Sequence, residues 1–322
     1  MSSASQDLFN WHPEQKQIFI TTHEHKAGLP MGTPRPEPVL TVLNYSGGRQ
    51  SAALLWMVIR GDIPRPKAFV AINADPGMEN SETYKYNEMM QGECEKAGIE
   101  LLLKIPGPNL LEDLLDLPNR TGLFRIDNPP YWTPPRKTRA ERGQLLQKCT
   151  KYYKIAPMNK MVRVVLERDF GISRRTSRMG KNIVEKWIGF HYDELSRITA
   201  PDQKFVYFRY PLIEMKLGKA DVDQYYEDNS IPIPPRSVCN ACFANGLDTL
   251  KDMHDNRPEE WTQAVKIDEI IRHGMEGAMV EEEAFVNETC IPLADLARMG
   301  FKVGANGKDQ DRWSCDSGYC FV

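Results

Sequence analysis

The stretch from Val39 to Leu55 reads VLTVLNYSGGRQSAALL, an apolar run that breaks at Ser46-Gly47-Gly48 and resumes with helical spacing. The apolar part lacks the alternating polar residues of a strand with one solvent-exposed face, so it predicts a buried strand of a parallel sheet. Two adjacent glycines let the backbone turn sharply, and the helix that follows directs its positive end at the turn. This order predicts a phosphate-binding loop, although it also occurs as an ordinary tight turn. The candidate nucleotide-binding residues of the loop are Ser46, Gly47, Gly48, Arg49, Gln50 and Ser51.

The loop is not a Walker A loop, because the Gly-Lys-Ser/Thr ending is missing and the two glycines are adjacent. It resembles the PP-loop of the adenine nucleotide alpha-hydrolase superfamily, which is usually written SGGxDS. Gln50 stands where that pattern has aspartate. This superfamily includes ATP pyrophosphatases, tRNA thiolases and sulfonucleotide reductases.

Length and composition describe an ordinary globular chain. It has 322 residues, a formal net charge of −3 and 41% hydrophobic residues, enough for one large domain or two modest ones. The start MSSASQDLFN lacks the pattern of a signal peptide, and no apolar run reaches the length of a membrane span, so we expect a cytoplasmic protein with no membrane partner. Seven cysteines in such a chain favour metal ligation or redox chemistry over a disulfide framework.

A second buried strand is predicted at Ala68 to Ile72, and Asp75 and Glu79 follow it. Ligands of doubly wound sheets lie beyond the carboxyl ends of the strands, so both carboxylates are expected near the glycine loop. Asp75 can also be a plain turn residue before Pro76-Gly77. Ser81 is expected to cap the helix that follows.

Cys239 and Cys242 form a Cys-x-x-Cys pair, a spacing that can direct two sulfurs at one metal. A redox dithiol or two buried thiols are the other interpretations. Thiolates suit iron–sulfur clusters and zinc alike, so the residue types do not choose between them.

Upstream, the proline-broken segment 126–135 is expected to lack regular structure, and its Tyr131 and Trp132 suggest a lid over a binding site.

Five motifs occur in the order found in the phosphoadenosine phosphosulfate (PAPS) reductase family, to whose short type the chain is similar. They are SGGRQS, ADPGMENSETY, CTKYYKIAP, GFHYDELSR and CNACF. The resemblance implies metal ligation by Cys149 with Cys239 and Cys242, and nucleotide binding by Gly189, Asp193 and Glu194. It also implies catalytic roles for Lys154 and Arg197, although Glu194 and Arg197 can equally form a surface salt bridge.

The chain ends with Cys315 and Cys320, and the family carries its nucleophilic cysteine in such a tail. Either cysteine is therefore a candidate nucleophile, and Cys320 is also a candidate fourth metal ligand. The resemblance favours a [4Fe-4S] cluster, with zinc as the alternative.

Three functions remain open from the sequence. The first is thiol-dependent reduction of an adenylated sulfate (PAPS or APS) to sulfite, with a thioredoxin-like donor. The second is an ATP-dependent, iron–sulfur-dependent sulfurtransferase that uses Mg with ATP and adenylates and thiolates a nucleic acid or small molecule. The basic loop from Arg174 to Lys181 and the lid of Tyr131 and Trp132 would then contact nucleic acid. The third is a non-catalytic module that binds adenine nucleotide.

The predicted fold is α/β, a doubly wound and mostly parallel sheet. The predicted divisions are an irregular lead-in over residues 1–38, a nucleotide-binding domain over 39–237, and a helical, cysteine-bearing extension over 238–322. The sequence does not indicate the oligomeric state.

Overall fold

The computed structural model describes residues 37–119, 129–135, 141–145, 148–173, 183–272 and 283–302. The predicted lead-in therefore lies almost wholly outside the described residues, as do Cys315, Cys320 and the basic loop from Arg174 to Lys181. Among the helices of the described residues, none is both long enough and apolar enough to cross a membrane.

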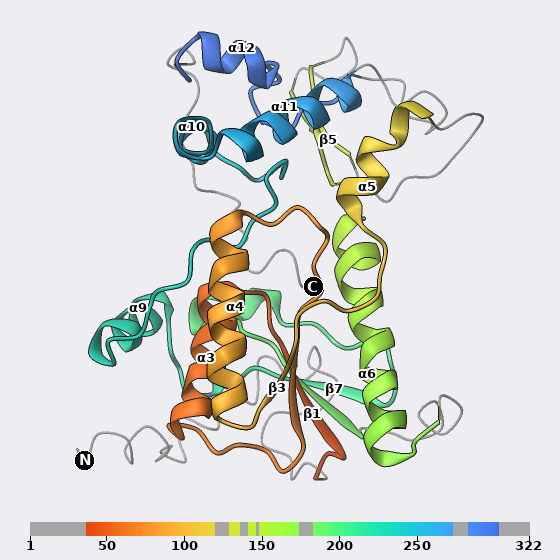
Figure 1. The fold of residues 1–322 in the computed structure, drawn as a ribbon, viewed down its shortest axis with the longest axis vertical. Helices are drawn as coiled ribbons and strands as arrows, with labels where there is room; N and C mark the ends of the chain where they lie inside the picture. Colours follow the sequence, from red (N-terminus) through yellow and green to blue (C-terminus); the bar gives the residue numbers. More distant parts are fainter. Residues whose placement is uncertain are drawn as a thin grey trace.

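A five-stranded parallel sheet forms the centre of the first part of the fold. Its strands lie in the order β3-β2-β1-β6-β7 (Figure 1). Its strands are β1 (Leu40–Asn44), β2 (Phe69–Ile72), β3 (Glu100–Leu102), β6 (Val184–Trp187) and β7 (Val206–Arg209). The chain winds outward from β1 to β3 and then restarts at β6 on the other side of β1. The strand order thus reverses at β1 and β6, and ligands of such sheets bind at that point, beyond the strands' carboxyl ends. The predicted α/β class with a mostly parallel sheet is confirmed.

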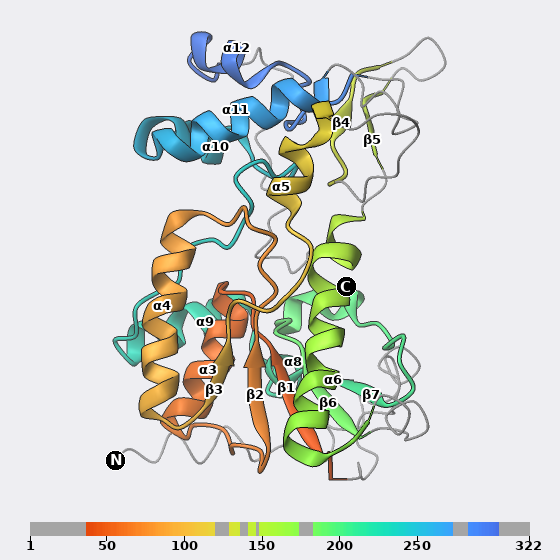
Figure 2. The ribbon, with the colours of Figure 1, turned by 45° about the vertical axis from the view of Figure 1, so that its right-hand side comes forward.

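Successive side chains of β1 point to opposite faces of the sheet, because side chains along a strand alternate with a period of two. Leu43 packs with Tyr45 against α3 (Arg49–Arg60), α4 (Ser81–Lys96) and α9 (Lys219–Asp228). Leu40 and Val42 pack on the other face against α6 (Ala156–Phe170). Figures 1 and 2 show α6 on the side of the sheet opposite α3 and α4.

A second hydrophobic core lies beyond the carboxyl end of the sheet. It contains α5 (Leu110–Leu115), α10 (Leu247–Asn256), α11 (Pro258–Arg272) and α12 (Leu293–Arg298), which Figure 2 shows as a separate helical layer. Tyr131 and Tyr153 belong to the same core, together with Val238, Ala241 and Cys242. The second core is therefore built from chain on both sides of the predicted boundary at residue 237. The remaining short elements are η1 (Leu117–Asn119), β4 (Trp132–Thr133), β5 (Gly143–Gln144), η2 (Thr150–Ile155), η3 (Tyr192–Arg197) and α8 (Pro211–Glu214).

Three local predictions were wrong. Segment 126–135 contains a short strand, because β4 pairs with β5 and bridges to Phe285. Tyr131 is fully buried and the Trp132 indole donates a hydrogen bond to the Phe243 carbonyl, so these rings belong to the second core and do not form a lid. The cap of α4 is Asn80, whose side chain accepts a hydrogen bond from the Thr83 amide at 2.7 Å, and Ser81 is the first helical residue.

Asp268 holds the second core together. Its carboxylate is fully buried and accepts hydrogen bonds from the amides of Val286 (3.1 Å) and Leu293 (3.0 Å), while Arg272 pairs with it from the next turn of α11. It therefore fastens α11 to the segment that leads into α12.

We expect Asp268→Asn to lower the free energy of unfolding by about 1–3 kcal/mol, because the asparagine Nδ2 cannot accept an amide hydrogen and Arg272 loses its carboxylate. Denaturant titration measures the change. Asp295→Asn is the matched control, since Asp295 forms an exposed pair with Arg298, and a change of about 0.5 kcal/mol or less is expected there. Equal effects in the two variants would contradict the role assigned to Asp268.

Candidate nucleotide and thiol site

The glycine loop joins β1 to α3, as the sequence predicts. Gly47 has φ +77°, a conformation that L-residues rarely adopt, and Gly48 is the N-cap of α3. The Ser46 hydroxyl lies 2.9 Å from the Ser51 hydroxyl and accepts a hydrogen bond from the Gly48 amide at 3.2 Å. These bonds fix the loop before any ligand arrives.

The N-terminus of α3 has the electrostatics of an anion site. Its first turn contains no acidic residue and its N-cap makes no side-chain hydrogen bond. The helix is 12 residues long, so its positive end is directed at the loop, and its own first turn adds no negative charge.

Glu79 links the loop to the cysteine segment. Residue 79 forms an antiparallel bridge with Cys239, and the Asn240 amide donates a hydrogen bond to the Met78 carbonyl at 2.8 Å. The Ser237 hydroxyl lies 3.1 Å from Glu79 Oε2 and 3.0 Å from the Ser46 carbonyl. The backbone leading into Cys-x-x-Cys therefore lies beside the glycine loop.

Glu79 also forms a buried ion pair with Lys154 of η2, with 3.5 Å between Oε1 and Nζ. Burial raises the pKa of the Glu79 carboxyl, and the charge of Asp75 raises it further, whereas Lys154 and Ser237 lower it. Asp75 is itself a turn residue, because its carboxylate accepts hydrogen bonds from the Gly77 amide (2.7 Å) and the Tyr84 hydroxyl (3.0 Å). The turn role of Asp75 is thus present in the structure, and a nucleotide role for it stays a prediction.

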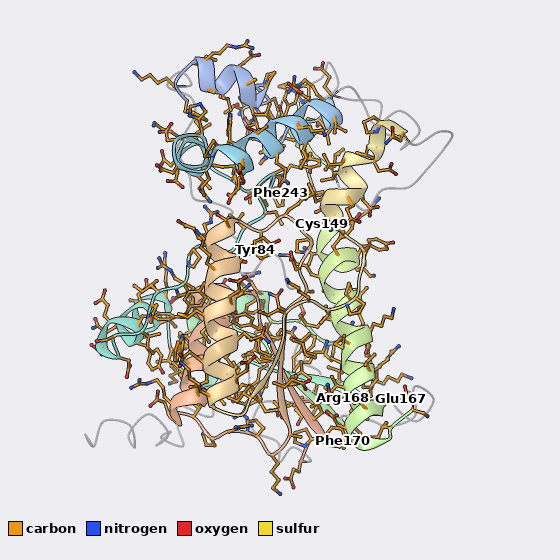
Figure 3. The ribbon with its side chains drawn as sticks, viewed as in Figure 1. Tyr84, Cys149, Glu167, Arg168, Phe170 and Phe243 are labelled. Atoms are coloured by element: carbon orange, nitrogen blue, oxygen red, sulfur yellow. The ribbon has the colours of Figure 1, made fainter. Side chains whose placement is uncertain are left out.

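The three predicted metal ligands all lie in or against the second core. Cys242 is buried within that core, and Cys149 and Cys239 pack against it. Burial raises the pKa of the Tyr131 phenol, and Cys149, Cys242 and Cys239 raise it further in that order, so all three sulfurs lie within electrostatic reach of one hydroxyl. Figure 3 shows Cys149 at the end of the η2–α6 run that faces the helical layer, opposite Glu167, Arg168 and Phe170.

Three thiols have the donor chemistry that iron–sulfur clusters and zinc require. Within the described ranges, however, no group of three or more histidine, cysteine, aspartate or glutamate side chains is arranged to hold a metal ion. The described thiols therefore do not by themselves complete a metal site. Cys320, the predicted fourth ligand, lies outside the described residues.

The Gln50 side chain contacts the segment that follows β6. Its Nε2 lies 2.9 Å from His191 Nε2 and 3.3 Å from Glu194 Oε2, inside a buried cluster. The other ring nitrogen of His191, Nδ1, lies 2.9 Å from Glu194 Oε2. Gln50 thus fastens the first turn of α3 to the segment after β6.

The predicted motif GFHYDELSR follows β6, and its residues form this contact with the first turn of α3. Strand β6 ends at Trp187, so this motif begins two residues after the strand. A Cβ at Gly189 would come within 3.0 Å of the Ser51 amide nitrogen, so only glycine allows this close approach to α3. Arg197 pairs with Glu194 at 2.5 Å and stacks over Phe190, and both partners of the pair are largely buried.

Two predicted nucleotide-binding side chains contact α9. The Arg49 guanidinium pairs with Asp223 at 2.9 Å, and the Asp193 carboxylate accepts a hydrogen bond from the Lys219 amide at 2.8 Å. A nucleotide role for either residue stays a prediction, as it does for the other site residues.

Sequence reasoning missed Ser237, His191, Asn44 and Lys186, and it assigned Tyr131 to a lid. Ser237 lies next to the CNACF motif and His191 lies within GFHYDELSR, and neither gave a signal of its own. Lys186 gave a signal that was not used, since a lysine within the buried strand VEKW is itself buried.

No family model matches the chain, and no curated protein matches it. Among solved structures, it is similar to the U34-tRNA thiolase NcsA from Methanococcus maripaludis with its [4Fe-4S] cluster, at 14% sequence identity and a TM-score of 0.38. The match covers 88% of this chain and 89% of that one. So distant a likeness carries no argument about activity, and the membership in the PP-loop superfamily stays a prediction from the motifs.

Proposed function

We propose that the chain is an ATP-dependent sulfurtransferase. The observation that carries this proposal is the pair of contacts from Ser237 to Ser46 and Glu79, which brings the Cys239-x-x-Cys242 segment beside the glycine loop. An anion held by the loop and a sulfur held by the thiols would then share one site.

The carboxylates favour ATP over a sulfonucleotide as the substrate. Asp75 and Glu79 lie at the carboxyl end of β2, near the loop, and carboxylates together with phosphate oxygens are the usual ligands of Mg²⁺. Lys154, next to Glu79, can donate to the pyrophosphate as its charge develops.

The proposed reaction is redox-neutral. An acceptor oxygen attacks the α-phosphorus of ATP and pyrophosphate leaves, which gives an adenylated acceptor. Hydrosulfide then attacks the activated carbon, the carbon–oxygen bond breaks, and AMP leaves with the oxygen while the proton passes to water. A bound [4Fe-4S] cluster would supply an iron at which sulfide is held, and zinc would supply a Lewis acid for the same purpose.

Cys149, Cys239 and Cys242 lie in or against the second core, which supports their use in this reaction, whereas reduction of PAPS or APS would use Cys315 or Cys320, both outside the described residues. The two reactions have different products. With ATP, Mg²⁺ and sulfide, we expect pyrophosphate release that depends on an added nucleic-acid or small-molecule acceptor. If the protein releases sulfite from PAPS or APS with a thiol donor and releases no pyrophosphate from ATP, it is a sulfonucleotide reductase and the proposal is wrong. If it binds nucleotide but forms neither product, it is a non-catalytic module.

The cysteines can be tested separately from turnover. After anaerobic reconstitution with iron and sulfide, we expect Cys149→Ser, Cys239→Ser and Cys242→Ser each to lose most of the bound iron and its visible absorbance. Cys94→Ser should keep both, because Cys94 is fully buried in the first core and burial raises the pKa of its thiol to about 12. Retention of iron by the three variants would exclude these thiols as ligands, and stoichiometric zinc in the untreated protein would identify the metal as zinc.

A further inference from the structure

A cavity of about 250 Å³ lies on the α6 face of the sheet, beside the glycine loop. Its polar lining includes Asn44 at the end of β1, Lys186 on β6 and Lys154 of η2, and its apolar lining includes Met158 of α6 and Phe208 of β7. Asn44 precedes the loop by two residues, and Lys154 pairs with Glu79. The cavity thus adjoins the loop but occupies the other face of β1 from α3.

The polar atoms of this lining are not matched with one another. Asn44 Oδ1 and Gln203 Oε1 are buried and have no hydrogen-bond partner among the described residues. Lys186 is 3% exposed and donates to Asn159 Oδ1, the one hydrogen bond its amine makes within the described part of the chain. Buried polar groups are almost always paired, so two acceptors and an under-used donor around one cavity indicate a ligand that supplies both kinds of partner.

The lining excludes simpler ligands. A phosphate would suit the two lysines, but its oxygens would face the amide oxygens of Asn44 and Gln203, which cannot donate to it. The Asp202 carboxylate also lines the cavity and would repel a phosphate. The ligand therefore needs N–H donors for the two amide oxygens and an acceptor atom for Lys186.

The volume limits the ligand to a small molecule. Pockets for drug-sized ligands run from about 300 to 1,000 Å³, so this cavity suits a single ring system. Met158 and Phe208 offer apolar surface to the faces of a ring, and the unpaired polar atoms would meet its edge. Protein pockets that hold a nucleobase combine these two features.

We propose that this cavity binds a nucleobase, whose edge N–H donates to Asn44 Oδ1 while a ring nitrogen or carbonyl oxygen accepts from Lys186 Nζ. Burial, and to a lesser degree the charge of Arg163, lowers the pKa of the Lys186 amine to about 7, so the pocket can hold an uncharged base without a second buried cation. The inference does not depend on sulfur transfer, because it concerns binding alone.

Saturation-transfer NMR on the full-length protein with uridine, cytidine, adenosine and guanosine tests the proposal, and calorimetry measures the affinities. We expect at least one nucleoside to bind, and Lys186→Met to weaken it about tenfold or more, the effect of losing about 1.4 kcal/mol of hydrogen bonding. Asn44→Ala should weaken the same nucleoside and is the second variant if Lys186→Met does not fold. Lys67→Met is the matched control, because Lys67 is exposed and pairs with Glu37 at the surface.

A second titration in the presence of a saturating non-hydrolysable ATP analogue identifies the source of the base. Displacement of the nucleoside assigns the cavity to the adenine of the nucleotide that the loop holds. Simultaneous binding assigns it to the base of a second substrate, such as a nucleotide of single-stranded RNA. Absence of binding by all four nucleosides, or equal affinity in the wild type, Lys186→Met and Asn44→Ala, would overturn the proposal whether or not pyrophosphate is released from ATP.

Discussion

Gly47→Ala is expected to reduce nucleotide-dependent turnover by roughly a hundredfold, the loss that a displacement of about 1 Å at a reacting centre can cause. A Cβ at Gly47 would lie 2.7 Å from Asn87 Oδ1 and 3.0 Å from Thr83 Cγ2. Asn87 cannot yield easily, because it is buried and accepts a hydrogen bond from the Tyr45 hydroxyl at 2.9 Å. The glycine turn must therefore move, and the amides at the start of α3 move with it.

Gly61→Ala separates this clash from backbone strain. Gly61 caps the other end of α3 with φ +78°, nearly the value at Gly47, but a Cβ there meets nothing within 4 Å. Both variants should lose about 1–2 kcal/mol of stability from the left-handed conformation. Only Gly47→Ala should add about 1–3 kcal/mol for overpacking and lose nucleotide affinity in a binding titration. Equal nucleotide affinity in the two variants would show that the turn does not hold the phosphates.

The sequence predicted the part of the site that depends on local pattern. The buried strand, the glycine turn and the helix are contiguous in the chain, so period and turn chemistry sufficed to place Gly47 and Gly48 at the carboxyl edge of the sheet. Topology then placed Glu79 there as well, because neighbouring parallel strands end at the same edge.

Long-range packing could not be predicted in this way. Tyr131 follows a proline-rich stretch and resembles a lid residue in sequence, yet it lies in a core whose other buried members are Tyr153 and residues from 78–117 and 238–296. The amide of Gln50 binds His191, 141 positions away, which no local pattern specifies. The role of Ser237 has the same origin, since its hydroxyl contacts a carbonyl 191 positions earlier in the chain.

The second large effect is expected at the buried pair of Glu79 and Lys154. Removing one partner leaves the other charge buried, so Lys154→Met and Glu79→Gln should each lower the free energy of unfolding by about 3–5 kcal/mol. The double variant should recover much of that stability, because it leaves no unpaired charge. If Lys154 also contacts the nucleotide, the double variant should remain inactive although it is folded. Recovery of turnover together with stability would limit the pair to a structural role. The exposed pair of Glu93 and Lys96 provides the matched cycle, with expected changes of about 0.5 kcal/mol or less.

The pH dependence of the free energy of unfolding of Lys154→Met shows whether an unpaired Glu79 carboxylate or lost packing destabilises the variant. Burial raises the pKa of Glu79 above its ordinary value of 4.5, so its protonated form contributes stability that is present at low pH and is lost as the pH rises through the folded-state pKa. Lys154 lowers that pKa, and its removal should raise it further. The stability deficit of Lys154→Met should therefore be small near about pH 5 and grow towards about pH 8. Denaturant titrations at both pH values measure this difference. A stability deficit that does not change with pH would mean that the variant loses packing around the lysine stem and that Glu79 carries no buried charge. Without that charge, there would be no electrostatic reason to place Mg²⁺ and a pyrophosphate beside Glu79.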